Sequence, residues 1–225
     1  MGIKSLGIGL SGLRTNLAAI ETTGHNIANA NTEGYSRQRV ELNTRSPEDN
    51  GAFIIGQGVQ VATIARVTDE FLETRLRKEG GAFAGYQETS NIMKEVEFSL
   101  NELSEQDLSN KLSSFFNSVN DFANNVDDNS TRVAMMEQGV SLANEFNRLD
   151  NSVRDIQTKI DGKIDGEIEN INLYLEKIAT INQEIVQTET GGFSTAVAND
   201  LRDKRDVYLR KISESMDIDV REESE

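Results

Sequence analysis

The stretch that most constrains the fold lies at the start of the chain. Residues 3–27 read IKSLGIGLSGLRTNLAAIETTGHNI, and apolar or small residues recur in them at alternating spacings of three and four. This is the a/d repeat of a coiled-coil helix, in which one narrow stripe faces a partner helix. We name this stripe the first seam; it consists of Ile3, Leu6, Leu10, Leu13, Leu17, Ile20, Gly24 and Ile27.

The first seam is apolar enough that another helix is expected to bury it. Each apolar side chain in it contributes about 1.5–3 kcal/mol on full burial, which together is on the order of 10–20 kcal/mol. A whole domain is stable by only ~5–15 kcal/mol, and a single helix of this length is marginal in water. We therefore expect the segment to be frayed until a partner helix covers it. Docking of the seam on the long helices of its own chain stays open as the alternative.

A turn and a short β-hairpin are predicted next. The helix should end within residues 30–34, because Asn31 and Gly34 are residue types that accept the left-handed conformation of helix ends. Residues 35–45 then have the composition of an extended segment, and residues 59–63 alternate like a strand. Asn50-Gly51 between them is a turn signal. The expected product is a small irregular β-hairpin.

Helical periodicity returns after residue 68 and continues almost to the end of the chain. The longest periodic stretch places apolar residues at threes and fours from Val133 to Ile185, and Gly191-Gly192 marks the turn that follows it. Gly80-Gly81 weakens the pattern near its start. The expected helices, three or four of which should share one seam as antiparallel neighbours, cover residues 68–101, 107–125, 130–188 and 196–216.

These patterns predict a mainly α chain. A content of 36% hydrophobic and 6% aromatic residues, with a single Pro, favours long helices with narrow apolar stripes. The expected organisation is an N-terminal coiled-coil helix, a small irregular hairpin or extended linker, an elongated antiparallel helical bundle, and the start of a truncated strand, over residues 1–34, 35–67, 68–216 and 217–225 respectively.

Charge and hydropathy exclude several classes of partner. The formal net charge is −15 without a basic patch, so we expect no nucleic acid. Residues 1–66 hold six Lys/Arg and five Asp/Glu, against 17 and 33 in the rest of the chain, which supports a boundary near residue 67. No apolar run is long enough to predict a membrane span. The N-terminus also lacks the apolar core and cleavage site of a signal peptide.

Residues that catalysis or metal binding would need are scarce. The chain has no Cys and one His, His25, so neither a two-His metal site nor a Ser-His-Asp relay is expected. Residues 7–12, GIGLSG, match the dinucleotide pattern G-x-G-x-x-G, but no buried strand can precede them. We expect no enzyme, catalytic residue, cofactor or metal. Acidic residues four positions before a basic residue are predicted to form solvent-exposed i, i+4 pairs on one helix, namely Asp200 with Lys204 and Asp206 with Arg210.

Two stretches carry a resemblance to a known family. Residues 23–38 read TGHNIANANTEGYSRQ, preceded by Ser11-Gly12-Leu13, and residues 199–206 read NDLRDKRD. With these motifs the chain resembles the axial proteins of the bacterial flagellum, which are rod, hook and hook-associated proteins. The continuation to residue 42 and the long helical region look most similar to the hook-associated protein 1 family.

The resemblance implies a structural role in the flagellum. Such a protein would join hook to filament, with its N-terminal helix paired to a C-terminal helix of the same polypeptide in an inner tube. It would reach the cell exterior through the flagellar type III system without a cleaved signal peptide. The implied partners are further copies in a helical or ring lattice, the hook protein, the second hook-associated protein, and an export chaperone that binds the C-terminal part.

The resemblance also implies roles for particular residues. The implied packing residues of the first seam are Ile3, Leu6, Leu10, Leu13, Leu17, Ile20 and Ile27. The residues implied to shape the turn out of the tube are Asn26, Asn29, Asn31, Gly34, Tyr35, Arg37 and Gln38.

The chain departs from the family pattern in two places. Glu33 stands where the family usually has Pro before the glycine of the turn. No apolar seam follows Ile212, so the C-terminal heptad helix of the family is missing and we expect a fragment of a longer protein. The alternatives are a flagellar rod or hook subunit, which would usually enter β structure soon after the N-terminal motif, and a soluble coiled-coil adaptor protein.

Overall fold

The computed structural model describes residues 2–49, 54–100, 108–190 and 195–221. The turns expected at Asn50-Gly51 and Gly191-Gly192 lie outside these residues. The mainly α fold with a small β-hairpin is confirmed. The elements in chain order are α1 (Gly2–Ala28), β1 (Gln38–Thr44), β2 (Glu48–Asp49), β3 (Ile54–Ile55), β4 (Val59–Arg66), α2 (Glu70–Leu100), α3 (Leu108–Asn124), α4 (Asn129–Thr190) and α5 (Thr195–Ser215).

The chain divides into two compact units. The first unit comprises Met1–Ala82 together with Ile171–Glu225, and the second comprises Phe83–Asn170. Helices α2 and α4 each contribute to both units. The domain boundaries expected from the sequence at residues 34, 67 and 216 stay predictions.

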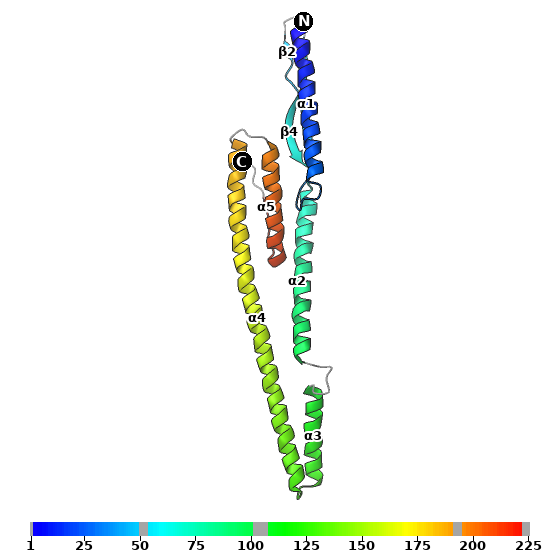
Figure 1. Ribbon diagram of the computed structural model, residues 1–225, viewed down its shortest axis with the longest axis vertical. Helices are drawn as coiled ribbons and strands as arrows, with labels where there is room; N and C mark the ends of the chain where they lie inside the picture. The colour runs from blue at the N-terminus through cyan, green and yellow to red at the C-terminus, as the bar shows by residue number, and fades with distance from the viewer. Residues whose placement is uncertain (1, 50–53, 101–107, 191–194, 222–225) are drawn as a thin grey trace. The chain divides into compact units, whose positions relative to one another are not determined.

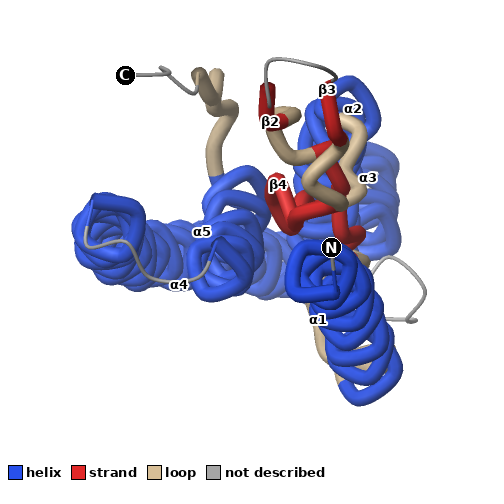
Figure 2. Tube along the Cα trace, turned by 90° about the horizontal axis from the view of Figure 1, so that it is seen from above, coloured by secondary structure: helices blue, strands red, loops and turns tan. Residues whose placement is uncertain are grey.

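The hairpin of the first unit is built from β1 and β4. They pair antiparallel, with Gln38 opposite Arg66 and Thr44 opposite Val59, and the register shifts by one residue between Glu41 and Leu42. Such a bulge increases the local twist of a two-stranded ribbon. Strand β4 contacts both α1 and α5 (Figure 2), so the hairpin lies between segments from the two ends of the sequence.

Helix α5 runs beside the C-terminal part of α4 in the first unit (Figure 1). The rings of Tyr174 and Tyr208 lie 5.7 Å apart, and Arg202 forms a 2.6 Å ion pair with Glu189. The buried apolar residues here, which form the core of this unit, are Ile181, Ile185, Ala198 and Ile212.

The second unit buries less of its apolar surface. Helix α3 packs on the N-terminal part of α4, where a Cβ at Gly139 would meet the ring of Phe115 at 3.5 Å. Among the described residues of this unit, the buried apolar ones are Leu149 and Ile156. Much of the long α4 seam is therefore uncovered, and its exposed members here are Val133, Met136, Val140, Phe146, Val153, Ile164 and Ile168.

The helix expected over residues 68–101 is formed, and α2 continues through Gly80-Gly81, where the apolar pattern weakens. One detail of the sequence-based prediction differs from the structure. Residues 217–221 have no regular secondary structure, so the strand expected there is not formed in the described residues. Alternation specifies which side chains share a face, but a strand also needs a neighbour for its backbone hydrogen bonds.

The two adjacent glycines of α2 should respond oppositely to alanine. A Cβ at Gly81 would overlap the backbone carbonyl of Ser213 in α5, whereas nothing lies within 4 Å of one at Gly80. Gly80→Ala should stabilise the chain by about 0.5–1 kcal/mol through helix propensity. Gly81→Ala should destabilise it by about 1–3 kcal/mol, because α5 must move. Urea unfolding followed by circular dichroism measures both, and equal effects would contradict the close approach of α2 and α5.

Candidate functional site

The first seam lies on the exposed face of α1. The fractional exposure of its described leucines and isoleucines ranges from 45% at Leu10 to 72% at Leu6 and Ile27. Leu13 is 69% exposed. Ile3 lies in α1, but its side chain is outside the described part of the structure. The expected alternative, docking of this seam on the chain's own helices, is not seen in the described residues.

The turn after α1 depends on glycine at position 34. Gly34 has φ 77°, in the left-handed region, and a Cβ there would overlap the side chain of Val207 in α5. Any other residue would therefore be strained twice, by its backbone conformation and by this neighbour. The turn is consequently pressed against α5.

Asn26 joins the end of α1 to the start of β1. Its amide oxygen accepts the backbone N–H of Gln38 at 2.8 Å, and its amide nitrogen donates to the Gln38 carbonyl at 2.9 Å. The Tyr35 hydroxyl donates to the same amide oxygen at 2.8 Å. His25 Nδ1 lies 2.9 Å from that hydroxyl, and because the Tyr35 proton points to Asn26, His25 is the donor here.

Helix α5 supplies acidic side chains that hold the hairpin and the turn. Asp203 accepts the backbone N–H of Ser36 at 2.8 Å and the Arg66 guanidinium at 2.9 Å. Arg66 also donates to Asp206 at 2.7 Å. The side chains of Arg66, Asp203 and Asp206 are only 12%, 6% and 17% exposed. Burial lowers the pKa of Arg66, but hydrogen bonds to Asp206 and Asp203 outweigh it, so the net pKa is raised.

Two further residues of α5 complete these contacts. Asp200 accepts the Gln38 side-chain amide at 2.8 Å and lies 3.5 Å from His25 Nε2. Asn199 donates to the Ile64 carbonyl of β4 at 2.6 Å. Burial first, then the charges of Asp200 and Asp203, raise the pKa of the Tyr35 hydroxyl, which stays a donor at neutral pH. We name the α5 set Asn199, Asp200, Asp203 and Asp206, with its partners Ser36, Gln38, Ile64 and Arg66, the clasp.

The structure brings only part of the predicted turn motif together. Tyr35, Gln38 and Asn26 form one network, and Gly34 makes the turn. Asn29 donates to the His25 carbonyl at 3.1 Å and accepts from Thr32, so it closes the end of α1. The other two predicted residues, Asn31 and Arg37, have exposed side chains.

The prediction of solvated i, i+4 pairs on α5 was wrong. Asp206 binds Arg66 of β4 in place of Arg210, and Arg210 binds Glu73 of α2 at 3.1 Å. The prediction failed because it considered only neighbours on the same helix, whereas these side chains face other elements. Sequence reasoning also missed Arg66 and Asp203 as partners. The motif at residues 199–206 marked the region, but no spacing rule joins residues that lie 137 positions apart.

The described residues form a cavity in the first unit and a groove in the second unit, both lined by polar side chains. A cavity of about 310 Å³ beside the clasp is lined by acids and bases together, among them Glu33, Asp200, Lys204 and Lys211.

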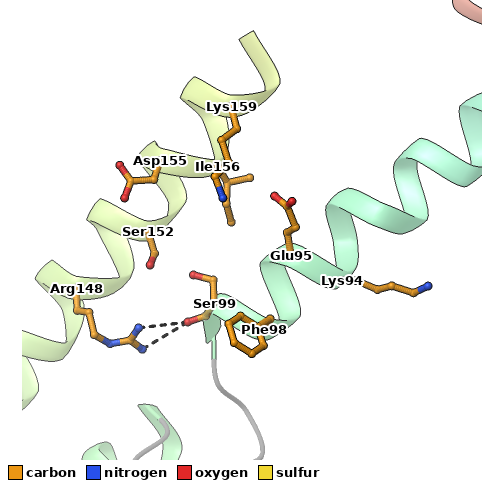
Figure 3. Close-up of a pocket in the computed structure, with 9 residues that line it drawn as sticks. All are labelled: Lys94, Glu95, Phe98, Ser99, Arg148, Ser152, Asp155, Ile156 and Lys159. Carbon is orange, nitrogen blue, oxygen red and sulfur yellow. Dashed lines mark hydrogen bonds between the residues drawn. The ribbon is translucent and has the colours of Figure 1, made fainter. Parts of the chain in front are cut away.

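In the second unit a groove of about 700 Å³ lies between α2 and α4 (Figure 3). There the Arg148 guanidinium donates to the Ser99 carbonyl at 3.4 and 3.5 Å, which satisfies the last turn of α2. The structure describes no group of three or more His, Cys, Asp or Glu side chains that could hold a metal. None of its helices has the length and apolar character needed to cross a membrane.

Removing the cation of the clasp should be costly. Arg66→Met leaves the buried carboxylates of Asp203 and Asp206 without their partner, which should lower the free energy of unfolding by about 3 kcal/mol. The matched control is Arg154→Met, because Arg154 forms a 2.8 Å pair with Asp150 in which both side chains are exposed. Its effect should stay within ~0.5 kcal/mol. Chemical denaturation measures the difference, and similar losses in the two variants would show that the clasp does not hold the unit together.

Comparison with known proteins identifies the chain's relatives. It is 31% identical over 210 residues to flagellar hook-associated protein 1 of Bacillus subtilis, covering 90% of this chain and 41% of the relative. It is 30% identical over 211 residues to the protein of the same name from Salmonella typhimurium, covering 94% and 38%. The Escherichia coli protein of that name is 28% identical over 215 residues. The chain thus spans about two fifths of the length of these relatives.

Two family models match different parts of the chain. A model of the flagellar basal body rod proteins matches residues 6–35, which contain most of the first seam and the turn. A model of the helical domain of flagellar hook-associated protein FlgK matches residues 93–225 and so covers more than half of the chain. The chain therefore belongs to the flagellar hook-associated protein FlgK family.

Proposed function

We propose that this chain is part of a non-enzymatic structural subunit of the bacterial flagellum, located where the hook meets the filament. The observation that carries the proposal is the exposed first seam on a helix whose end is bound by Asn26 to Gln38, a residue that the clasp holds in turn. A surface of this kind is suited to packing against another helix. The names of the relatives support the flagellum as the assembly in which this packing occurs.

The glycines of α1 support close packing by a partner. Nothing in the described structure lies within 4 Å of a Cβ built at Gly7, Gly9, Gly12 or Gly24. Each glycine inside a helix lowers its stability by roughly 0.5–1 kcal/mol relative to alanine, and no contact among the described residues accounts for that cost. An approaching helix backbone would account for it, since glycine leaves room for such an approach.

The partners belong to the proposal. In this proposal, a C-terminal helix of the same full-length polypeptide and neighbouring copies in the axial lattice pack on the first seam and bury it. The hook protein, the second hook-associated protein and a flagellar export chaperone are the other proposed partners. Export would proceed through the flagellar type III system to the cell exterior.

A rod subunit is the second candidate, because the rod-protein model matches the first seam and turn. The match to the hook-associated helical domain covers far more of the chain and includes the whole of α3, α4 and α5. It therefore favours the hook–filament junction over the rod.

Charges placed on the first seam should block assembly without unfolding the chain. Leu13→Asp with Leu17→Asp, made in the full-length protein, should lower its incorporation into flagella at least about tenfold, because burying an unpaired carboxylate is costly. Helicity should persist, since both side chains are exposed. The measurements are swimming of a complemented null strain, the subunit content of purified flagella, and circular dichroism.

The matched control for this test is Asn16→Asp with Thr23→Asp. Both of these α1 residues are exposed and lie off the first seam, so this variant adds the same charge to the same helix. It should incorporate better than the seam variant. Normal incorporation of the seam variant would refute the proposed function.

A further inference from the structure

Helix α1 rests on the hairpin through a face of hydroxyl side chains. Ser11 and Thr15 are 4% exposed and Thr22 is 8% exposed, and α1 contacts both β1 and β4. Thr15 donates to the carbonyls of Ser11 and Gly12 at 3.2 and 3.0 Å, and Thr22 donates to that of Ala18 at 2.8 Å. Because α1's own backbone accepts these hydroxyl protons, the two threonines donate no directional bond to the hairpin.

Ser11 differs from the threonines because it binds the hairpin. Its hydroxyl donates to the Ile8 carbonyl at 2.7 Å and accepts the backbone N–H of Val59, the first residue of β4, at 3.2 Å. Gly58 has φ 87°, and a Cβ there would overlap the Ser11 hydroxyl. The contact therefore needs glycine at this position for two separate reasons. We name the contact of Ser11 with Gly58 and Val59 the Ser11 latch.

The two ends of α1 are held very differently. At its C-terminal end, Asn26 binds both backbone groups of Gln38, and His25 and Tyr35 add to the same network. Toward its N-terminal end, a single neutral hydrogen bond forms the Ser11 latch. One such bond changes an equilibrium by only about two- to tenfold.

Little else opposes separation of the N-terminal half of α1 from the hairpin. The residues that α1 buries in its described part are polar, namely Ser11, Thr15 and Thr22. Its large apolar residues in that half, such as Leu6 and Leu13, are exposed on the first seam. Separation therefore exposes no fully buried apolar side chain of the described part of α1, and burial of apolar surface is the main term that would resist it.

We infer that α1 is a lever, hinged at Asn26 and held on the hairpin by the Ser11 latch, and that the part of α1 before Asn26 swings off the hairpin when the latch opens. The clasp and the turn stay intact during this motion, because none of their bonds involves residues before His25. The lever allows the first seam to change its angle toward a partner helix. The inference goes beyond the proposed function, and its test does not depend on assembly.

Hydrogen exchange of the whole chain, read by mass spectrometry, tests the lever. Once released from the hairpin, α1 is a single helix that is marginal in water and frays. Ser11→Ala should therefore speed amide exchange in residues 6–20 about two- to tenfold and leave residues 26–38 unchanged. The control is Thr23→Ala, because the Thr23 hydroxyl is exposed and donates to the Ala19 carbonyl of the same helix at 2.8 Å. That variant should not speed exchange in either region. Equal exchange in the two variants would refute the latch.

A second variant opens the latch from the hairpin side. Gly58→Ala leaves the sequence of α1 unchanged and should produce the same faster exchange in residues 6–20. If Gly58→Ala leaves exchange in residues 6–20 unchanged, the latch is contradicted. The same holds if Ser11→Ala leaves it unchanged. If either variant speeds exchange in residues 26–38 to the same extent, α1 and the turn open as one unit and there is no hinge at Asn26.

Discussion

The buried carboxylate of Asp203 is the contact on which the rest of the first unit depends. It binds the backbone of Ser36 in the turn and the guanidinium of Arg66 at the end of β4, so three segments far apart in sequence meet at one side chain. Being nearly excluded from water, this carboxylate must keep its partners, since an unpaired buried charge is strongly unfavourable. The position of the turn against α5, and therefore the exit of α1 from that turn, follows from this constraint.

The arrangement of α1 is the reverse of that of an ordinary surface helix. Such a helix buries its apolar stripe and exposes its polar face, whereas α1 places Ser11, Thr15 and Thr22 inward and its leucines outward. The clasp makes this arrangement compatible with a folded unit, because it fixes the hairpin and turn through polar contacts and leaves the apolar stripe free. We propose that another helix completes α1, and this proposal connects membership of a flagellar hook-associated family with the exposed apolar stripe.

The sequence predicted those features that depend on local patterns. Periodicity located the helices and the first seam, and the glycine of the turn was recognised because Gly34 belongs to a residue type that accepts a left-handed conformation. The clasp could not be predicted, since Arg66 and Asp203 become neighbours only after the hairpin and α5 fold together. The i, i+4 rule predicted the wrong partner for Asp206, which binds Arg66, 140 positions away. The start of a strand expected over residues 217–225 is not formed in the described residues 217–221 for a similar reason, because strand formation depends on a partner that local alternation cannot supply.

The central claim is that the first seam is uncovered in the free chain and covered in the assembly. These 225 residues contain no Cys, so Leu13→Cys places a single thiol in them, on the first seam. Its rate of labelling by a maleimide should be compared between the dilute isolated protein and purified flagella that contain it. The labelling rate in the isolated protein should lie within a few-fold of that in denaturant, and the thiol should be strongly protected in the flagella. Strong protection in the dilute isolated protein, or free labelling in the flagella, would contradict the central claim.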